Sequence, residues 1–234
     1  MSEIVDVKKA QKEYIRQELR PILYEQGFKL SKPTTYVRER NGLLQEFYFR
    51  VEVYRLRPWV SLRPIFDARN IVTFGMDSAY TNDVKSPYYG YNWVTFPIGR
   101  TIGISEWNEQ ILPKFDKLKS SIQKGVLPEL NKLHSLDDFL QLYQENGFLF
   151  GKRIQSHPGV EIYYDFIAKV ALSSGGERMC MILSEMQEPW LQILSKEVNA
   201  FLQSCMNQTF SDEEADKMFE EYCEVIRRSL SLQK

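Results

Sequence analysis

The chain has 234 residues, of which 43% are hydrophobic and 26% are charged, and its formal net charge is −1 at pH 7. This composition is typical of a globular protein that is long enough to bury an ample core. A net charge so close to zero argues against a general nucleic-acid-binding protein, which needs a basic surface.

The start of the chain lacks the basic and apolar segments of a signal peptide, and no run approaches 18 apolar residues. We therefore expect no membrane partner. Cys180, Cys205 and Cys223 are an odd number of cysteines without CxxC spacing. This pattern predicts reduced thiols in the core of a cytoplasmic protein rather than disulfides.

The first predicted element is an amphipathic helix from about Glu3 to Gln26, along which apolar residues recur at helical spacing. Pro21 is expected to kink this helix or to start a new turn. Gly27 is the expected left-handed cap, and Phe28 is the apolar residue that folds back after it.

A β-hairpin is predicted around Asn41-Gly42, because two alternating runs meet at this dipeptide, which is the strongest short-range hairpin signal. A two-residue loop would place Arg38 on the face of Phe47 and Phe49. A three-residue loop, with the glycine in a bulge, would place Val37 on that face and set Arg38 beside Glu46. Because one apolar face normally decides the register, we predict the three-residue loop.

Further strands are predicted downstream of the hairpin. A tight turn at Arg55–Pro58 should lead into a third strand, and a fourth strand is expected near Ile71–Phe74. The aromatic segment 75–103 lacks periodicity, but it is too rich in aromatic residues to be disordered. We expect it to pack on the sheet, with a short strand at Trp93–Phe96.

The rest of the chain is predicted to be helical. Helices should start near Ser105, Ser121, Ser135, Pro158, Gly176 and Ser211, with a kink at Pro189. Capping boxes are predicted at Ser135 and Ser211. Strands followed by helices indicate an α+β fold. Residues 1–104 should form a helix on an antiparallel sheet of three to five strands, and residues 105–234 a helical region packed on that sheet as one compact unit.

The sequence contains no signature that assigns a catalytic residue, a cofactor or a metal. His157, Glu161 and Asp165 have the spacing of metal ligands on a helix. However, His157 precedes Pro158 and should lie at the helix cap, outside the regular face. We therefore expect no metal and no cofactor, although catalysis stays an open question.

The polar face of the predicted sheet is the strongest candidate for a functional surface. The candidate partner-binding residues are Tyr36, Arg38, Tyr48, Arg50, Glu52, Trp59 and Arg63. Tyr, Trp and Arg dominate binding hot spots, and arginine recognises carboxylates and phosphates in a planar, bidentate way. Cross-strand pairs of such residues also stabilise ordinary solvated faces by about 0.2–1 kcal/mol each. A solvated face, a protein-binding surface and a platform for single-stranded nucleic acid or a small anion therefore all stay open.

Several segments together carry a family resemblance. They are the helix ending at Leu23–Phe28, the Tyr-Val-Arg-Glu strand, the Asn-Gly turn, Phe47-Tyr48-Phe49, and Leu127-Pro128 leading to Ser135–Leu140. Over about residues 8 to 147, the chain resembles a bacterial family of uncharacterised domains, some of which look like immunity proteins encoded beside secreted toxins. The resemblance implies binding to another protein and supplies no catalytic residues.

We therefore expect a non-catalytic interaction protein, and in the most specific form of this hypothesis it is an immunity protein that neutralises a toxin. Such proteins occlude a site on their partner, so they need complementary charge and aromatic anchors rather than catalytic groups. The alternative is an enzyme or a small-ligand-binding protein with a pocket between the polar sheet face and the 75–103 segment.

Overall fold

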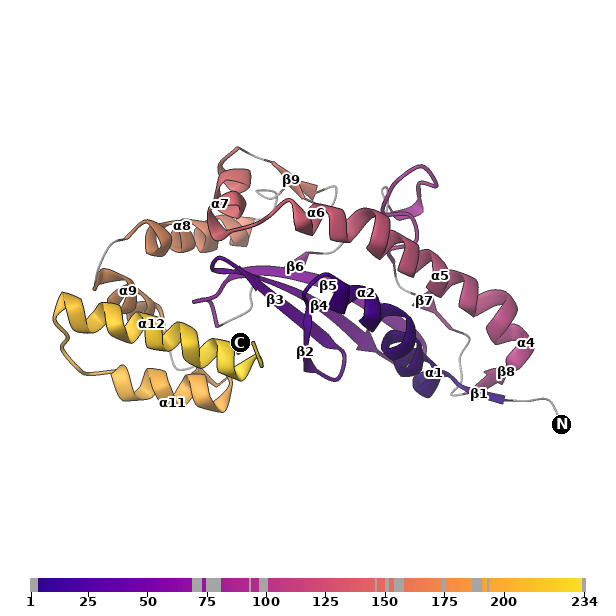
Figure 1. The fold of residues 1–234 in the computed structure, drawn as a ribbon, viewed down its shortest axis with the longest axis horizontal. Helices are drawn as coiled ribbons and strands as arrows, with labels where there is room; N and C mark the ends of the chain where they lie inside the picture. The colour runs from indigo at the N-terminus through magenta and orange to yellow at the C-terminus, as the bar shows by residue number, and fades with distance from the viewer. Residues whose placement is uncertain are drawn as a thin grey trace.

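The computed structural model describes residues 4–68, 73–74, 81–92, 94–96, 101–145, 147–149, 152–153, 158–173, 176–186, 191–192 and 194–232. It has the predicted α+β fold, with an N-terminal helix, an antiparallel sheet and a helical C-terminal half. Figure 1 shows the sheet in the middle, with the helical run α4–α6 along one side and α9, α11 and α12 gathered at one end.

The main sheet is antiparallel, and its strands follow one another in chain order. They are β2 (Lys29–Lys32), β3 (Thr35–Arg40), β4 (Leu43–Val51), β5 (Arg55–Pro64) and β6 (Thr73–Phe74), and β7 (Val94–Thr95) also pairs with β5. The strands predicted near Ile71–Phe74 and Trp93–Phe96 are thus confirmed. The turn predicted at Arg55–Pro58 is wrong, because the chain turns at residues 52–54, where the Glu52 N–H donates to the Arg55 carbonyl.

The β3–β4 hairpin has a two-residue loop, so the predicted register is wrong. Asn41 and Gly42 have φ angles of 41° and 83°, and Arg40 pairs directly with Leu43. Two positive φ values in succession belong to a type I′ turn, whose twist matches that of the flanking strands. Arg38 consequently lies opposite Gln45 rather than beside Glu46.

The prediction failed because both faces of this sheet are covered. Val37 and Leu44 are buried on the same face as Glu46, while Phe47 and Phe49 are buried on the other. An apolar face fixes the register only where the other face is exposed, so this rule cannot choose between the two registers here. The conformational preference of Asn-Gly then decides the register.

The N-terminal helix begins one turn later than predicted. A short strand β1 (Ile4–Asp6) pairs with β8 (Thr101–Gly103), and Asp6 then caps α1 (Val7–Tyr14) by accepting from the Lys9 N–H at 2.9 Å. The predicted C-cap is confirmed, since Gly27 has a φ of 81° and the Phe28 N–H donates to the Leu23 carbonyl.

In the described part of the chain, three prolines lie within continuous helical runs, and a π-helical turn precedes each of them. These turns are η1 (Ile15–Leu19) before Pro21 in α2 (Arg20–Glu25), η2 (Trp107–Ile111) before Pro113 in α5 (Leu112–Ser121), and η3 (Ile122–Val126) before Pro128 in α6 (Leu127–Asn131). Proline lacks an N–H and its ring clashes with the carbonyl four residues earlier, and a wider turn relieves both problems. From α4 (Ile104–Glu106) to α6, one continuous helical run therefore stands where two helices were predicted.

The C-terminal half is helical with one short hairpin. Its elements are α7 (Leu136–Gln144), β9 (Phe148–Leu149), β10 (Lys152–Arg153), α8 (Pro158–Leu172), α9 (Glu177–Glu185), α11 (Lys196–Cys205) and α12 (Asp212–Ser229). The capping box at Ser211 is confirmed, whereas at Ser135 only the serine bonds to the helix, because Asp138 accepts from the His134 N–H instead. Pro189 lies outside the described residues. None of the helices described here is both long and apolar enough to cross a membrane.

Helices pack on both faces of the sheet. On the inner face, the ring of Phe28 lies 5.3 Å from that of Phe47, and Tyr24 lies 6.3 Å from Tyr36. The other face, called the polar face below, carries the alternate residues of β3, β4 and β5: Thr35, Val37, Glu39, Leu44, Glu46, Tyr48, Arg50, Arg57, Trp59, Ser61 and Arg63. One end of the polar face meets α12, where Nε and Nη2 of Arg227 each donate to Glu39 at 2.8 Å.

Candidate functional site

Two of the seven candidate residues do not belong to the polar face. Tyr36 and Arg38 lie on the inner face and are only 0% and 3% exposed. The two-residue turn moves every residue of β3 to the face opposite the predicted one. Neither residue is therefore available to a partner in this structure.

Arg38 instead stabilises the fold through buried hydrogen bonds. Its guanidinium donates at 2.8 Å to each of three uncharged acceptors: Gln45 Oε1, the Gln26 carbonyl and Asn131 Oδ1. Gln26 caps the C-terminus of α2 and Asn131 ends α6, so two helix C-termini direct partial negative charge at the cation. Burial and the charge of Arg40 lower the pKa of Arg38 to about 9, which leaves it charged at neutral pH.

The exposed part of the polar face brings four of the candidate residues together. Tyr48 lies directly opposite Trp59, and Arg50 lies directly opposite Arg57. We call this surface the open patch; it consists of Tyr48, Arg50, Glu52, Tyr54, Arg55, Arg57 and Trp59. Tyr48 is 39% exposed and Tyr54 is 50% exposed. Tyr54, Arg55 and Arg57 are not among the seven candidates, and the sequence analysis places the two arginines in a turn rather than in the strand.

Glu52 organises the charges of the open patch. Its carboxylate lies 2.9 Å from Nε of Arg50 and 3.9 Å from Nε of Arg57, and it also pairs with Arg55. Like charges directly opposite one another destabilise a sheet, and the carboxylate offsets the repulsion between Arg50 and Arg57. Three guanidinium groups around one carboxylate leave the patch with a net positive charge.

Arg63, the remaining candidate, lines a cavity at the other end of the polar face. This space, called the sheltered cavity below, has a volume of about 560 Å³. It is lined by Ser31, Lys32, Thr35, Glu46, Tyr48, Arg63, Ala68, Ser195, Val198, Ile226, Ser229 and Leu230. Its floor is the sheet, and its cover consists of α11 and α12. Tyr48 belongs to both the cavity and the open patch, so the two are continuous.

The described residues of the 75–103 segment lie against more than one element. Val94–Thr95 pairs with β5 as predicted, but residues 87–90 pack on the helical run α5–η3, where an added Cβ at Gly125 would lie 2.4 Å from the Pro87 carbonyl oxygen. The Tyr89 hydroxyl likewise accepts from Lys117 of α5 at 3.2 Å. None of the described residues of this segment lines the sheltered cavity, whose cover is formed by α11 and α12 instead.

Glu46 in the sheltered cavity should make stability depend on pH. Burial raises the pKa of its carboxyl group, against the lowering effects of Arg63 and Lys32. A raised carboxyl pKa means that the folded state favours the protonated form, so its stabilising contribution is lost as the pH rises. Glu46→Gln should therefore raise the Tm at pH 7. The advantage should fade near pH 4, close to the ordinary pKa of Glu, and a Tm gain that is equal at both pH values would contradict this cause.

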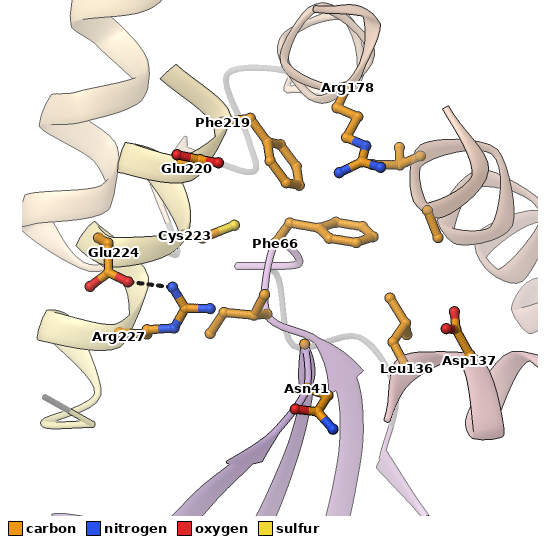
Figure 2. A pocket seen from close by; sticks show the side chains of 14 residues that line it. Asn41, Phe66, Leu136, Asp137, Arg178, Phe219, Glu220, Cys223, Glu224 and Arg227 are labelled. Carbon is orange, nitrogen blue, oxygen red and sulfur yellow. Dashed lines mark hydrogen bonds and ion pairs between the residues drawn. The ribbon is translucent and has the colours of Figure 1, made fainter. Parts of the chain in front are cut away.

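A second cavity, of about 490 Å³, is lined in part by Phe66 and by Cys223 and Arg227 of α12. Figure 2 shows Phe66 and Phe219 facing one another across it, with Arg178 above them and Arg227 bonded to Glu224. The ring centroids of the two phenylalanines are 5.9 Å apart. Arg178 donates to the Ser173 carbonyl at 2.6 Å and Arg227 is paired twice, so the cations of this cavity are already engaged by the fold.

Comparison with known proteins gives no relative for this chain. No family model, no curated protein and no solved structure matches it. Its function is therefore argued from the surfaces described above.

The possible metal ligands and the three cysteines are not members of the open patch or of the residue set that lines the sheltered cavity. His157 lies outside the described residues, and the described part of the chain holds no group of three or more His, Cys, Asp or Glu side chains arranged around a possible metal ion. Cys205 and Cys223 are buried as predicted, but Cys180 is exposed on α9, which corrects the expectation for that residue.

A thiol reagent should therefore modify one cysteine quickly and two slowly in the native protein. The thiolate is the reactive form, and burial raises the pKa of Cys223 to about 12 and also raises that of Cys205. Cys180→Ser should abolish the fast phase, while denaturant should make all remaining thiols react. Two or more fast thiols without denaturant would contradict the packing described here.

Proposed function

We propose that this chain is a non-catalytic interaction protein of the cytoplasm that binds another protein through the open patch. In the most specific form of the proposal, the partner is a toxin and the chain is its immunity protein. The observation that supports binding best is the clustering of aromatic and arginine side chains on adjacent strands, where the exposed Tyr48 and Arg50 lie opposite the partly buried Trp59 and Arg57.

The charge of the open patch indicates the kind of partner. Arg50, Arg55 and Arg57 outnumber the single carboxylate of Glu52, so an acidic surface would be complementary and would be attracted at long range. The side chain of Arg50 is 57% exposed. It can therefore bind a carboxylate of the partner without unfolding any element of the sheet.

The proposal is tested by affinity capture from an extract of the native cell with matched baits. A double variant, Tyr48→Ala with Arg50→Ala, should fail to retain a protein that the wild type retains. The matched control is Tyr24→Ala with Arg16→Ala, because Tyr24 is 46% exposed and the side chain of Arg16 is 56% exposed in a similar ion pair. The control should retain the partner. Equal capture by all three baits would rule out the open patch as the binding surface.

The immunity role needs a separate test, because a partner could be something other than a toxin. The product of the neighbouring gene should arrest growth when it is expressed alone, and co-expression of this chain should restore growth. Co-expression of the double variant should not restore it. If the neighbouring product is harmless, the immunity form of the proposal fails while the binding proposal stands.

Small-ligand binding is the second candidate function, and the sheltered cavity is the specific observation that favours it. Its volume of about 560 Å³ falls within the range of about 300–1,000 Å³ that is usual for ligand pockets. Arg63, buried in its wall, is a residue type suited to carboxylate recognition.

A further inference from the structure

The guanidinium group of Arg63 makes fewer hydrogen bonds within the fold than that of Arg38. Both are almost fully buried, with 5% and 3% exposure. Arg38 has three acceptors, whereas Nη1 of Arg63 donates to the Asp67 carbonyl and its Nε has no hydrogen-bond partner. A buried cation that is incompletely bonded is costly, and because Arg63 lines the cavity, an anion bound there would stabilise its guanidinium group.

The other charged groups of the sheltered cavity lie close to Arg63. Arg63 and Lys32 both act on the carboxyl group of Glu46, whose pKa they lower against the larger effect of burial. Glu46 and Arg63 lie on neighbouring strands of the same face, since Glu46 pairs with Ser61. The cavity therefore presents two cations and one carboxylate to whatever enters it.

The cover of the cavity is partly apolar, because three hydrophobic residues line it beside Ser195 and Ser229. Val198 of α11 and Ile226 and Leu230 of α12 contribute its hydrophobic wall. An occupant with a hydrocarbon portion would bury it against these helices, at a gain of about 0.8 kcal/mol for each CH₂ group. The polar floor and the partly apolar cover together favour an amphipathic small molecule.

We propose that the sheltered cavity binds a small zwitterion of the amino-acid type. Its carboxylate faces Arg63 and Lys32, its ammonium group faces Glu46, and its side chain packs under Val198 and Ile226. A simple carboxylate would be repelled by Glu46, and a simple amine would be repelled by the two cations. Only a molecule that carries both charges complements all three groups.

The test compares three ligands of similar size by isothermal titration at pH 7. L-Norleucine carries both charged groups, hexanoate lacks the ammonium group, and pentylamine lacks the carboxylate. Norleucine should bind at least about tenfold more tightly than either analogue, which corresponds to about 1.4 kcal/mol. No measurable heat with norleucine, or hexanoate binding as tightly as norleucine, would overturn the proposal.

Substitutions of Glu46 and Lys32 test whether the ligand binds in the sheltered cavity. Arg63 is left in place, because its loss could unfold the protein. Glu46→Gln should weaken norleucine binding about tenfold and strengthen hexanoate binding, so that the preference between the two is lost. Lys32→Met should weaken the binding of both norleucine and hexanoate, because each carries a carboxylate. The matched control is Lys132→Met, since Lys132 is a solvent-exposed lysine paired with Glu129 outside the cavity. If both variants bind norleucine like the wild type, the ligand lies elsewhere and the assignment is wrong.

Discussion

Replacing Arg38 with methionine should lower the free energy of unfolding by about 3 kcal/mol or more. The substitution leaves Gln45 Oε1 and the Gln26 carbonyl without the guanidinium that now donates to each of them at 2.8 Å, and it leaves Asn131 Oδ1 with only the longer 3.3 Å bond from Arg40. Buried acceptors without a donor cost far more than an average hydrogen bond contributes. Urea denaturation of the variant measures this loss directly.

The controls for this prediction separate geometry from charge. Arg38→Lys should also be destabilising, because an ammonium group lacks the planar fork that reaches three acceptors in fixed directions. Arg16→Ala, at an exposed arginine, should change stability by no more than about 0.5 kcal/mol. A loss of less than about 1 kcal/mol for Arg38→Met would mean that Arg38 faces solvent, as the three-residue loop requires.

Phe47→Ala should cost about 3–5 kcal/mol, whereas Tyr48→Ala should cost about 1 kcal/mol or less. Phe47 is fully buried between Phe28 and Phe49, with ring centroids 5.3 and 6.2 Å away. Tyr48 is its neighbour in sequence but points to the polar face and is 39% exposed. The two variants are measured by the same urea denaturation experiment.

This pair also tests whether the open patch is uncovered. If another segment packed over the patch, truncating Tyr48 would leave a cavity and would cost about as much as truncating Phe47. Similar losses for both variants would therefore remove the open patch from the candidate binding surfaces. A large loss for Phe47→Ala alone is the expected outcome.

Local chemistry made part of this structure predictable. The Asn-Gly hairpin, the glycine cap after α2 and the capping box at Ser211 all follow from short-range rules, and all three are present. The grouping of Tyr48, Arg50 and Trp59 was also predictable. Alternation along β4 and β5 fixes it, whatever register β3 adopts.

The errors arise from contacts between distant parts of the chain. The alternation predicts a surface position for Arg38, because nothing nearby in sequence shows that two helix ends, at Gln26 and Asn131, supply its acceptors. The ion pair between Glu39 and Arg227 joins residues 188 positions apart. Period-2 alternation reports which residues share a face, but not which element covers it. The sheltered cavity depends on that cover and so could not be predicted.

The dissociation constant of the captured partner tests binding through the open patch most directly. Tyr48→Ala and Arg50→Ala should each weaken binding by about 2 kcal/mol, or roughly 30-fold, if they are hot spots. Tyr24→Ala and Arg16→Ala should leave the constant unchanged, and the affinity of the wild type should fall as salt increases. If both patch variants, correctly folded, bind as tightly as the wild type, the open patch is not the binding surface.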